Sequence, residues 1–201
     1  QVMKEEKKIC HYLDLPIQHA SDRILKRMGR RTTRAQLTAT IEKLRKEIPD
    51  IVLRTTLITG FPGETEEDHQ ELMEFVDEME FDRLGAFTYS PEEGTPAETM
   101  EDQIPEEIKE ERRDEIMELQ QEISLEKGND RIGQELLVMI EGKVSGESAY
   151  IARTYGDAPK VDGYIFVQTG ELLMTGDFAK VRVTGALEYD LIGELADEYT
   201  E

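Results

Sequence analysis

The chain has 201 residues, a formal net charge of −21 and one cysteine. This length suits one or two domains with a sizeable core, and no apolar run approaches the roughly 18 residues of a membrane-spanning helix. The acidity argues against a nucleic-acid duplex as the main partner, because Lys and Arg bind phosphate backbones, and a single cysteine excludes a disulfide framework.

The chain opens on a charged stretch, QVMKEEKKI, without an initiator methionine or a signal sequence. We therefore expect a piece of a longer protein. One cysteine and no apolar leader also favour a cytoplasmic setting.

The first part of the chain alternates predicted strands and helices. The predicted elements are a strand at 9–17, a helical turn after Ser21, a helix at 33–48, a strand at 51–59, a helix at 65–79 that opens with a Thr65–Asp68 capping box, and a strand at 84–90. Short connections between these elements predict βαβ units with parallel strands. Three strands do not close a barrel, so we expect part of a TIM-like barrel.

The second part of the chain changes in character. A long polar helix with an apolar stripe at Ile108, Ile116, Leu119 and Ile123 is predicted over 105–128, starting at Pro105. After Gly133, short β-runs separated by turn signals predict a small antiparallel barrel or sandwich. The predicted fold class is therefore α/β: a partial parallel TIM-like barrel over residues 1–130, followed by an OB-like all-β barrel over 131–201.

Three loops follow the predicted strands, at the end where parallel α/β barrels carry their chemistry. The middle loop, ITGFPGETEED, resembles a phosphate-binding loop but lacks its Lys, and its carboxylates already occupy the positive end of the helix dipole. A phosphate ligand is therefore disfavoured. Gly60 and Gly63 could admit a neutral or cationic group such as a purine edge or a sulfonium; the alternative is a tight turn before a self-capped helix.

Four segments together resemble the radical S-adenosylmethionine methylthiotransferase family. They are YLDLPIQHASDRILKRMGR, LRTTLITGFPGETEEDHQEL, FDRLGAFTYSPEEGTPA and RTYGDAPKVDGYIFV. The resemblance covers nearly the whole chain and implies the C-terminal half of a radical domain followed by a TRAM domain. In that family S-adenosylmethionine donates a methyl group and also yields a 5′-deoxyadenosyl radical, which abstracts hydrogen from the carbon that is methylthiolated.

The resemblance nominates a cofactor site. The expected cofactor-binding residues are Gln18, His19, Ser21, Arg54, Thr56, Ile58, Gly60, Phe61 and Glu64. Among these, Ile58, Gly60 and Glu64 match the family's adenine motif, and the loop at Gln18 would lie near the ribose and methionine. Arg54 shares its strand phase with Ile58, so we expect it to meet the methionine carboxylate or the substrate.

The family's cluster ligands have no counterpart in this sequence. A CxxxCxxC motif and three further cysteines hold two [4Fe–4S] clusters in that family, whereas this chain has only Cys10, which we interpret as a small buried residue within a strand. No metal ligand is therefore predicted here. The parent protein would be an enzyme, and this chain alone would be inactive.

Several features favour the branch that modifies an aspartate of small-subunit ribosomal protein S-twelve over the branch that modifies tRNA. They are YLDLPIQH in the first strand, EEGT after the third strand, and GDAPKVDG near the end. Residues 131–201 carry 13 acidic and 6 basic side chains, a net of −7. An acidic barrel suits a basic protein, whereas a tRNA-binding barrel needs a basic face.

The expected substrate residues are Tyr12, Asp14, Tyr89, Glu92 and Glu93. For Glu92 and Glu93, hydrogen bonding within a turn is an equal alternative. A tRNA adenosine methylthiotransferase and a TRAM-based binding module without activity stay open as alternatives. An open edge of the partial barrel could also pair with a second copy to form a dimer.

Overall fold

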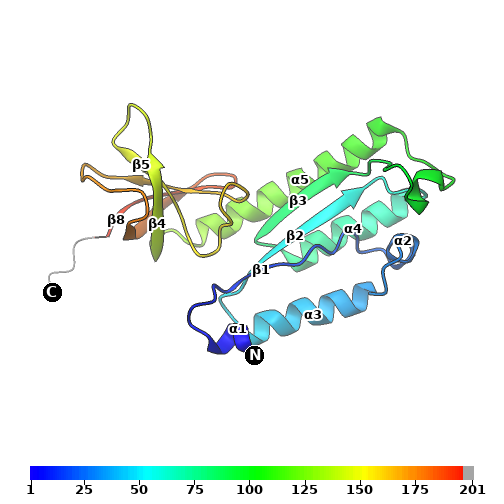
Figure 1. Cartoon of the computed structure of the whole chain (residues 1–201), viewed down its shortest axis with the longest axis horizontal. Coiled ribbons are helices and arrows are strands. Elements are labelled where there is room, and N and C mark those ends of the chain that lie inside the picture. The colour runs from blue at the N-terminus through cyan, green and yellow to red at the C-terminus, as the bar shows by residue number, and fades with distance from the viewer. Residues whose placement is uncertain (197–201) are drawn as a thin grey trace. The chain divides into compact units, whose positions relative to one another are not determined.

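The computed structural model describes residues 1–196, which form two compact units (Figure 1). One unit is Leu13–Ile123, and the other combines Gln1–Tyr12 with the chain from Ser124 onward. The predicted domain boundary at residue 130 stays a prediction. Within residues 1–196, no helix combines the length and the apolar character needed to cross a membrane.

The Leu13–Ile123 unit is built on a three-stranded sheet in the order β1-β2-β3. Its elements are most of β1 (Tyr12–Asp14), α2 (Asp22–Arg27), α3 (Arg34–Glu47), β2 (Val52–Thr59), α4 (Glu66–Met79), β3 (Arg83–Thr88), the 3-10 helix η1 (Pro96–Thr99) and most of α5 (Glu106–Asn129). Strands β2 and β3 are parallel, with Ile58 opposite Phe87. The predicted parallel α/β arrangement is therefore confirmed.

The first strand is shorter than predicted: of the expected strand 9–17, only Tyr12–Asp14 has regular strand geometry. Pro16 has no N–H to donate. Pairing with β2 continues around it, since the Leu15 N–H donates to Arg54 O at 2.8 Å and the Gln18 N–H to Thr56 O at 2.9 Å. Cys10 lies before β1 and is exposed, so its interpretation as a buried strand residue was wrong.

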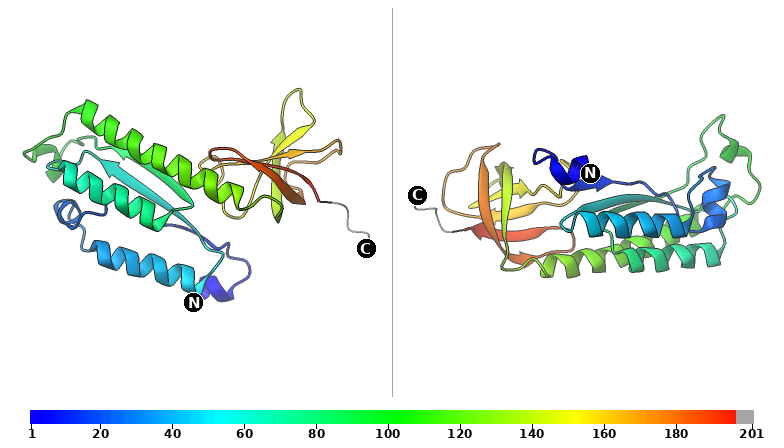
Figure 2. Two further views of the ribbon diagram at one scale, coloured as in Figure 1. Left: turned by 180° about the vertical axis from the view of Figure 1, so that it is seen from behind. Right: turned by 90° about the horizontal axis from the view of Figure 1, so that it is seen from below.

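Helices α3, α4 and α5 lie in a layer on one side of the sheet (Figure 2, right). The predicted capping box is present, and the inner face of α4 buries Leu72, Phe75 and Val76. Leu53 and Leu57 of β2 are buried on the helix side, whereas Arg54, Thr56 and Ile58 alternate with them and are only half-buried. The alternation leaves a polar and partly open face opposite the helices.

Helix α5 departs from the predicted apolar stripe. Ile116 and Ile123 are buried, but Ile108 is 38% exposed, and Lys109 and Arg112 are buried in its place. The apolar pattern could not show this, because the two cations are buried through polar contacts with distant loops.

The second unit contains α1 (Val2–Glu5) and a closed barrel in the order β4-β5-β6-β8-β7. The strands are β4 (Glu135–Lys143), β5 (Ala149–Arg153), β6 (Ile165–Gln168), β7 (Phe178–Ala186) and β8 (Leu191–Leu195), around an apolar core that includes Val138, Ile140, Val167, Val181 and Val183. The barrel is not antiparallel throughout, since β6 and β8 pair in parallel. The β7–β8 hairpin inserts its second strand beside β6, which gives these two strands one direction.

Candidate functional site

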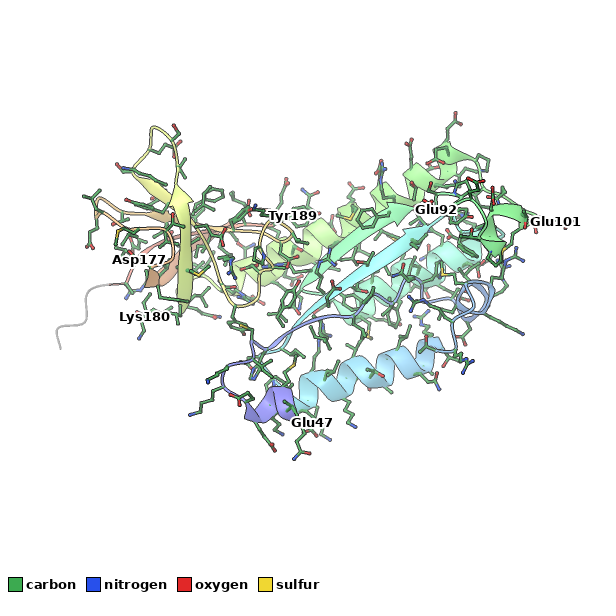
Figure 3. The ribbon with its side chains drawn as sticks, viewed as in Figure 1. Glu47, Glu92, Glu101, Asp177, Lys180 and Tyr189 are labelled. Carbon is green, nitrogen blue, oxygen red and sulfur yellow. The ribbon has the colours of Figure 1, made fainter. Side chains whose placement is uncertain are left out.

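A cavity of about 510 Å³ lies where β2 and β3 end. Its lining residues are Gln18, Met28, Arg30, Thr56, Ile58, Phe61, Phe87, Thr88, Tyr89, Ser90, Glu92, Thr95 and Ala97. Figure 3 labels Glu92 and Glu101 at this end of the sheet. The cavity thus joins the three strand-end loops that the sequence singled out, and its size is ordinary for a small-molecule site.

Several predicted residues line the cavity, and others do not. Those that do are Gln18, Thr56, Ile58, Phe61, Tyr89 and Glu92; the predicted residues outside the lining are Tyr12, Asp14, His19, Ser21, Arg54, Gly60, Glu64 and Glu93. Gln18 has a φ of +70°, unusual for a residue with a side chain. Its N–H and C=O both bond to β2, the latter accepting from Ile58 at 2.8 Å, so its side chain is presented from a fixed and strained backbone.

Arg30 is the cation of the cavity lining; it ends the segment YLDLPIQHASDRILKRMGR but was not among the expected site residues. Gly29, at φ +74°, ends α2, and the Arg30 N–H then donates to Leu25 O at 2.9 Å. Its guanidinium makes no ion pair or hydrogen bond with any residue in the described part of the chain. Burial lowers the pKa of Arg30 from its ordinary value without a carboxylate to compensate. Arg30 as a whole is exposed, but this cation lies in the cavity lining without a partner among residues 1–196, which suits an anionic ligand group.

Tyr89 forms a second unsatisfied feature of the cavity. The residue is 8% exposed, and its hydroxyl has no hydrogen-bond partner among residues 1–196. Burial, with the charges of Glu98 and Glu92, raises the pKa of Tyr89, so the phenol stays protonated and able to donate. Its ring stands edge-on to that of Phe61, with centroids 5.2 Å apart. The cavity therefore has an aromatic wall with an unused donor.

The glutamate of the glycine-rich loop, Glu64, is hydrogen-bonded by backbone amides of the same loop. The Glu64 carboxylate is buried and accepts hydrogen bonds from the Gly60 N–H at 2.8 Å and the Phe61 N–H at 3.3 Å. Arg112 Nη1 donates to Glu64 Oε1 at 3.0 Å. The amides that a phosphate would need are thus occupied. Glu64 lies behind the loop rather than on the cavity wall.

His19 and Ser21 belong to a buried network next to that loop. His19 Nδ1 accepts from the Ser21 N–H at 3.0 Å, which places the proton of the neutral ring on Nε2, 3.5 Å from Glu64 Oε2. Ser21 Oγ donates to Asp68 Oδ1 at 2.7 Å. Burial raises the pKa of Asp68, but hydrogen bonds from Arg23, Ser21 and Thr65 outweigh it and hold this pKa well below its usual range.

The remaining predicted residues have partners elsewhere. Arg54 Nη1 donates to Asp14 Oδ2 at 2.9 Å and to Thr56 Oγ1 at 3.2 Å. Tyr12 Oη donates to Asp162 Oδ2 at 2.7 Å within the barrel-containing unit. In the described part of the chain, no group of three or more His, Cys, Asp or Glu side chains could hold a metal ion.

Two family models match the chain. The radical SAM superfamily model covers residues 1–76, and the TRAM domain model covers residues 132–196. Radical SAM proteins as a class use S-adenosylmethionine together with iron–sulfur clusters. The TRAM match falls on the closed barrel.

Curated relatives align over nearly the whole chain. A "Ribosomal protein uS12 methylthiotransferase RimO" of Lachnoclostridium phytofermentans is 62% identical over 192 residues, which is 96% of this chain and 44% of the relative. Proteins of the same name from Pelotomaculum thermopropionicum and Desulfitobacterium hafniense are each 53% identical over 194 residues, covering 96% of this chain and 44% and 43% of the relative. The chain thus spans less than half the length of these relatives. Both models and these relatives agree: over nearly its whole length the chain is similar to radical SAM methylthiotransferases, with the radical SAM match followed along the chain by the TRAM match.

Proposed function

We propose that the cavity at the ends of β2 and β3 binds S-adenosylmethionine, and that the whole protein methylthiolates an aspartate of small-subunit ribosomal protein S-twelve. The observation that carries the first part is the pairing of an apolar aromatic wall with an unpaired guanidinium in one cavity. The names of the relatives support the second part. Bound S-adenosylmethionine would supply the methyl group and the means of activating the target carbon.

The lining residues fit the parts of S-adenosylmethionine. Ile58, Phe61 and Phe87 offer apolar surface to the adenine, and Arg30 offers a charge-assisted hydrogen bond to the methionine carboxylate. Arg54 was expected in that role, but its guanidinium is engaged by Asp14, so we assign the carboxylate to Arg30. The cofactor roles of His19, Ser21 and Glu64 stay predictions; their contacts favour shaping the loops.

The described residues do not fit an iron–sulfur cluster. The sequence has one cysteine, Cys10, and it is exposed without other candidate ligands grouped around it. We assign both [4Fe–4S] clusters expected for the family to parts of the protein outside this sequence. The role of this chain is to bind and orient the cofactor and the substrate.

Glu92 supports a basic protein substrate. It is the acidic residue of the cavity lining, and its carboxylate forms no hydrogen bond or ion pair with residues 1–196. A free carboxylate at the cavity favours a cationic side chain beside the target and repels a nucleic-acid phosphate. Glu93 does not line the cavity, so its role as a substrate residue is a weaker proposal.

Calorimetry with S-adenosylmethionine, on this chain and on the whole protein, tests the cavity. The proposal is supported if either protein binds S-adenosylmethionine and a substitution of Arg30 weakens that binding. If neither protein gives heat or thermal stabilisation, only the function of a TRAM-based binding module is left. Filter binding tests the substrate. Tight, salt-sensitive binding of tRNA without binding of the ribosomal protein would favour the tRNA branch instead.

A dimer through the open edge of the sheet is a separate proposal. The sheet ends at β1 and β3, so unpaired backbone groups on these strands could pair with a second copy. Light scattering at high protein concentration decides it: a monomeric mass would exclude the dimer.

A further inference from the structure

The glycine-rich loop has a second side, away from the cavity, where helix α5 meets it. Lys109 and Arg112 lie three residues apart on α5 and are 5% and 7% exposed. Residues at this spacing share one face of a helix. Two cations are rarely buried so completely unless specific partners compensate for the lost hydration.

Arg112 is partnered by the loop itself. Its Nη1 donates to Glu64 Oε1 at 3.0 Å and to the Glu64 backbone oxygen at 3.2 Å, and the same carboxylate accepts from the Gly60 and Phe61 amides. Arg112 and Glu64 are therefore a buried ion pair that closes the loop on itself. Removing Arg112 would leave a buried carboxylate with no compensating charge.

Lys109 is partnered by the neighbouring strand end. Its Nζ donates to Tyr89 O at 2.9 Å and lies 5.4 Å from the centre of the Tyr89 ring. Its carbonyl accepts from Thr59 Oγ1 at 3.0 Å. The side chain also fills the space beside Gly60, where an added Cβ would collide with Lys109 Cγ. Gly60 is therefore required by α5.

The two contacts converge on one wall of the cavity. Arg112 fixes the loop that carries Phe61, Lys109 holds Tyr89, and the rings of Phe61 and Tyr89 contact each other in the cavity lining. We infer that Lys109 and Arg112 are positioning residues for the cofactor: from α5 they hold the Phe61–Tyr89 wall in its ligand-binding shape. The inference rests on the proposed function of the cavity.

The test compares matched variants of helix α5 in the whole protein. Arg112→Gln removes the ion pair, and Ile116→Val loosens a buried apolar contact of the same helix. Arg113→Gln removes a charge whose partner among residues 1–196 is its neighbour Asp114. We expect S-adenosylmethionine to bind about tenfold more weakly to Arg112→Gln, since hydrogen bonds to charged groups are worth this much. Affinity should be unchanged in Arg113→Gln and in Ile116→Val, even where Ile116→Val lowers the melting temperature.

A second change separates positioning from general destabilisation. Adding Glu64→Gln to Arg112→Gln removes the unpaired buried charge while keeping an oxygen that can accept from Gly60, so affinity should recover most of the loss. The inference is overturned if Arg112→Gln binds as well as the unchanged protein, or if Ile116→Val at an equal melting temperature loses as much affinity.

Hydrogen exchange distinguishes failure of the inference from failure of the proposed function. If the unchanged protein does not bind S-adenosylmethionine, the assignment of the cavity fails, but exchange of the Gly60 and Phe61 amides can still be measured without ligand. We expect these amides to exchange about tenfold faster in Arg112→Gln and not in Ile116→Val. Equal protection in both variants would overturn the role of α5, whether or not the ligand binds.

Discussion

The loops that follow β2 and β3 end at the same cavity but are built in opposite ways. In the β2 loop, Gly60, Phe61 and Glu64 are buried, and the Glu64 carboxylate accepts hydrogen bonds from backbone amides and from Arg112. In the β3 loop, residues 90–95 are all exposed, and the Glu92 carboxylate has no partner in the part of the chain that the structure describes. Both loops are acidic and contain glycine, so composition does not separate a rigid support from a recognition surface. What separates the two kinds of loop is whether their carboxylates have partners within the protein.

The largest difference between the loops should come from their glycines. Gly60 (φ +68°) and Gly94 (φ +78°) are both left-handed, but a Cβ at Gly60 would collide with Lys109, whereas a Cβ at Gly94 meets nothing within 4 Å. Gly94→Ala should cost about 1 kcal/mol of unfolding free energy from backbone strain. Gly60→Ala should cost about 2 kcal/mol more, because overpacking adds to that strain. Urea denaturation of both variants measures the difference, and equal losses would contradict the tight loop.

Asp68, at the start of the helix that follows the buried β2 loop, predicts that the stability of the fold depends on pH. Because the pKa of Asp68 is depressed in the folded protein, its hydrogen bonds stabilise the fold fully above the unfolded pKa of about 4 and lose that effect as the pH falls toward the folded value. Asp68→Asn should therefore lose about 2 kcal/mol at neutral pH. The gap from the unchanged protein should shrink below about pH 4 in denaturation curves. A gap independent of pH would mean that shape, rather than charge, matters at this position.

Local patterns predicted much of this fold, and long-range polar contacts limited the rest. The Thr65–Asp68 capping box and the β2 strand follow from residues close in sequence. The orientation of Glu64 depends on Arg112, 48 residues away, and the buried face of α5 depends on the same loop. Likewise, the parallel β6–β8 pair depends on how a hairpin returns to a distant strand. No periodicity encodes such contacts.

The cavity was predictable only in part, for the same reason. The loop positions and the family motif led to Gln18, Ile58 and Phe61, all of which line it. Arg30 was missed, because the resemblance assigned no role to the end of its segment; what distinguishes it is its place in the cavity lining without a partner among residues 1–196. Arg54 was predicted as a site residue because it lies on the same face of its strand as Ile58, but its charge is paired with Asp14.

Arg30, a charge without a partner in the described structure, is predicted to affect ligand binding rather than stability. Arg30→Ala should weaken S-adenosylmethionine binding about tenfold by calorimetry, since it removes a charge-assisted hydrogen bond, and should leave the melting temperature unchanged. Arg31→Ala is the matched control, because Arg31 is an exposed neighbour outside the cavity lining. If the two variants bind alike, the carboxylate of the ligand lies elsewhere.

The smallest effect is expected in the open loop, where solvent screens the charge. Glu92→Gln should weaken binding of the basic ribosomal protein two- to fivefold at low salt, because an exposed ion pair contributes about 1 kcal/mol or less, and the difference should fade as salt is added. Affinity for S-adenosylmethionine should stay the same. Glu93→Gln, just outside the cavity lining, separates a specific contact from a general loss of negative charge. An equal, salt-dependent loss in both variants would show that the field of the loop, rather than Glu92 itself, attracts the substrate.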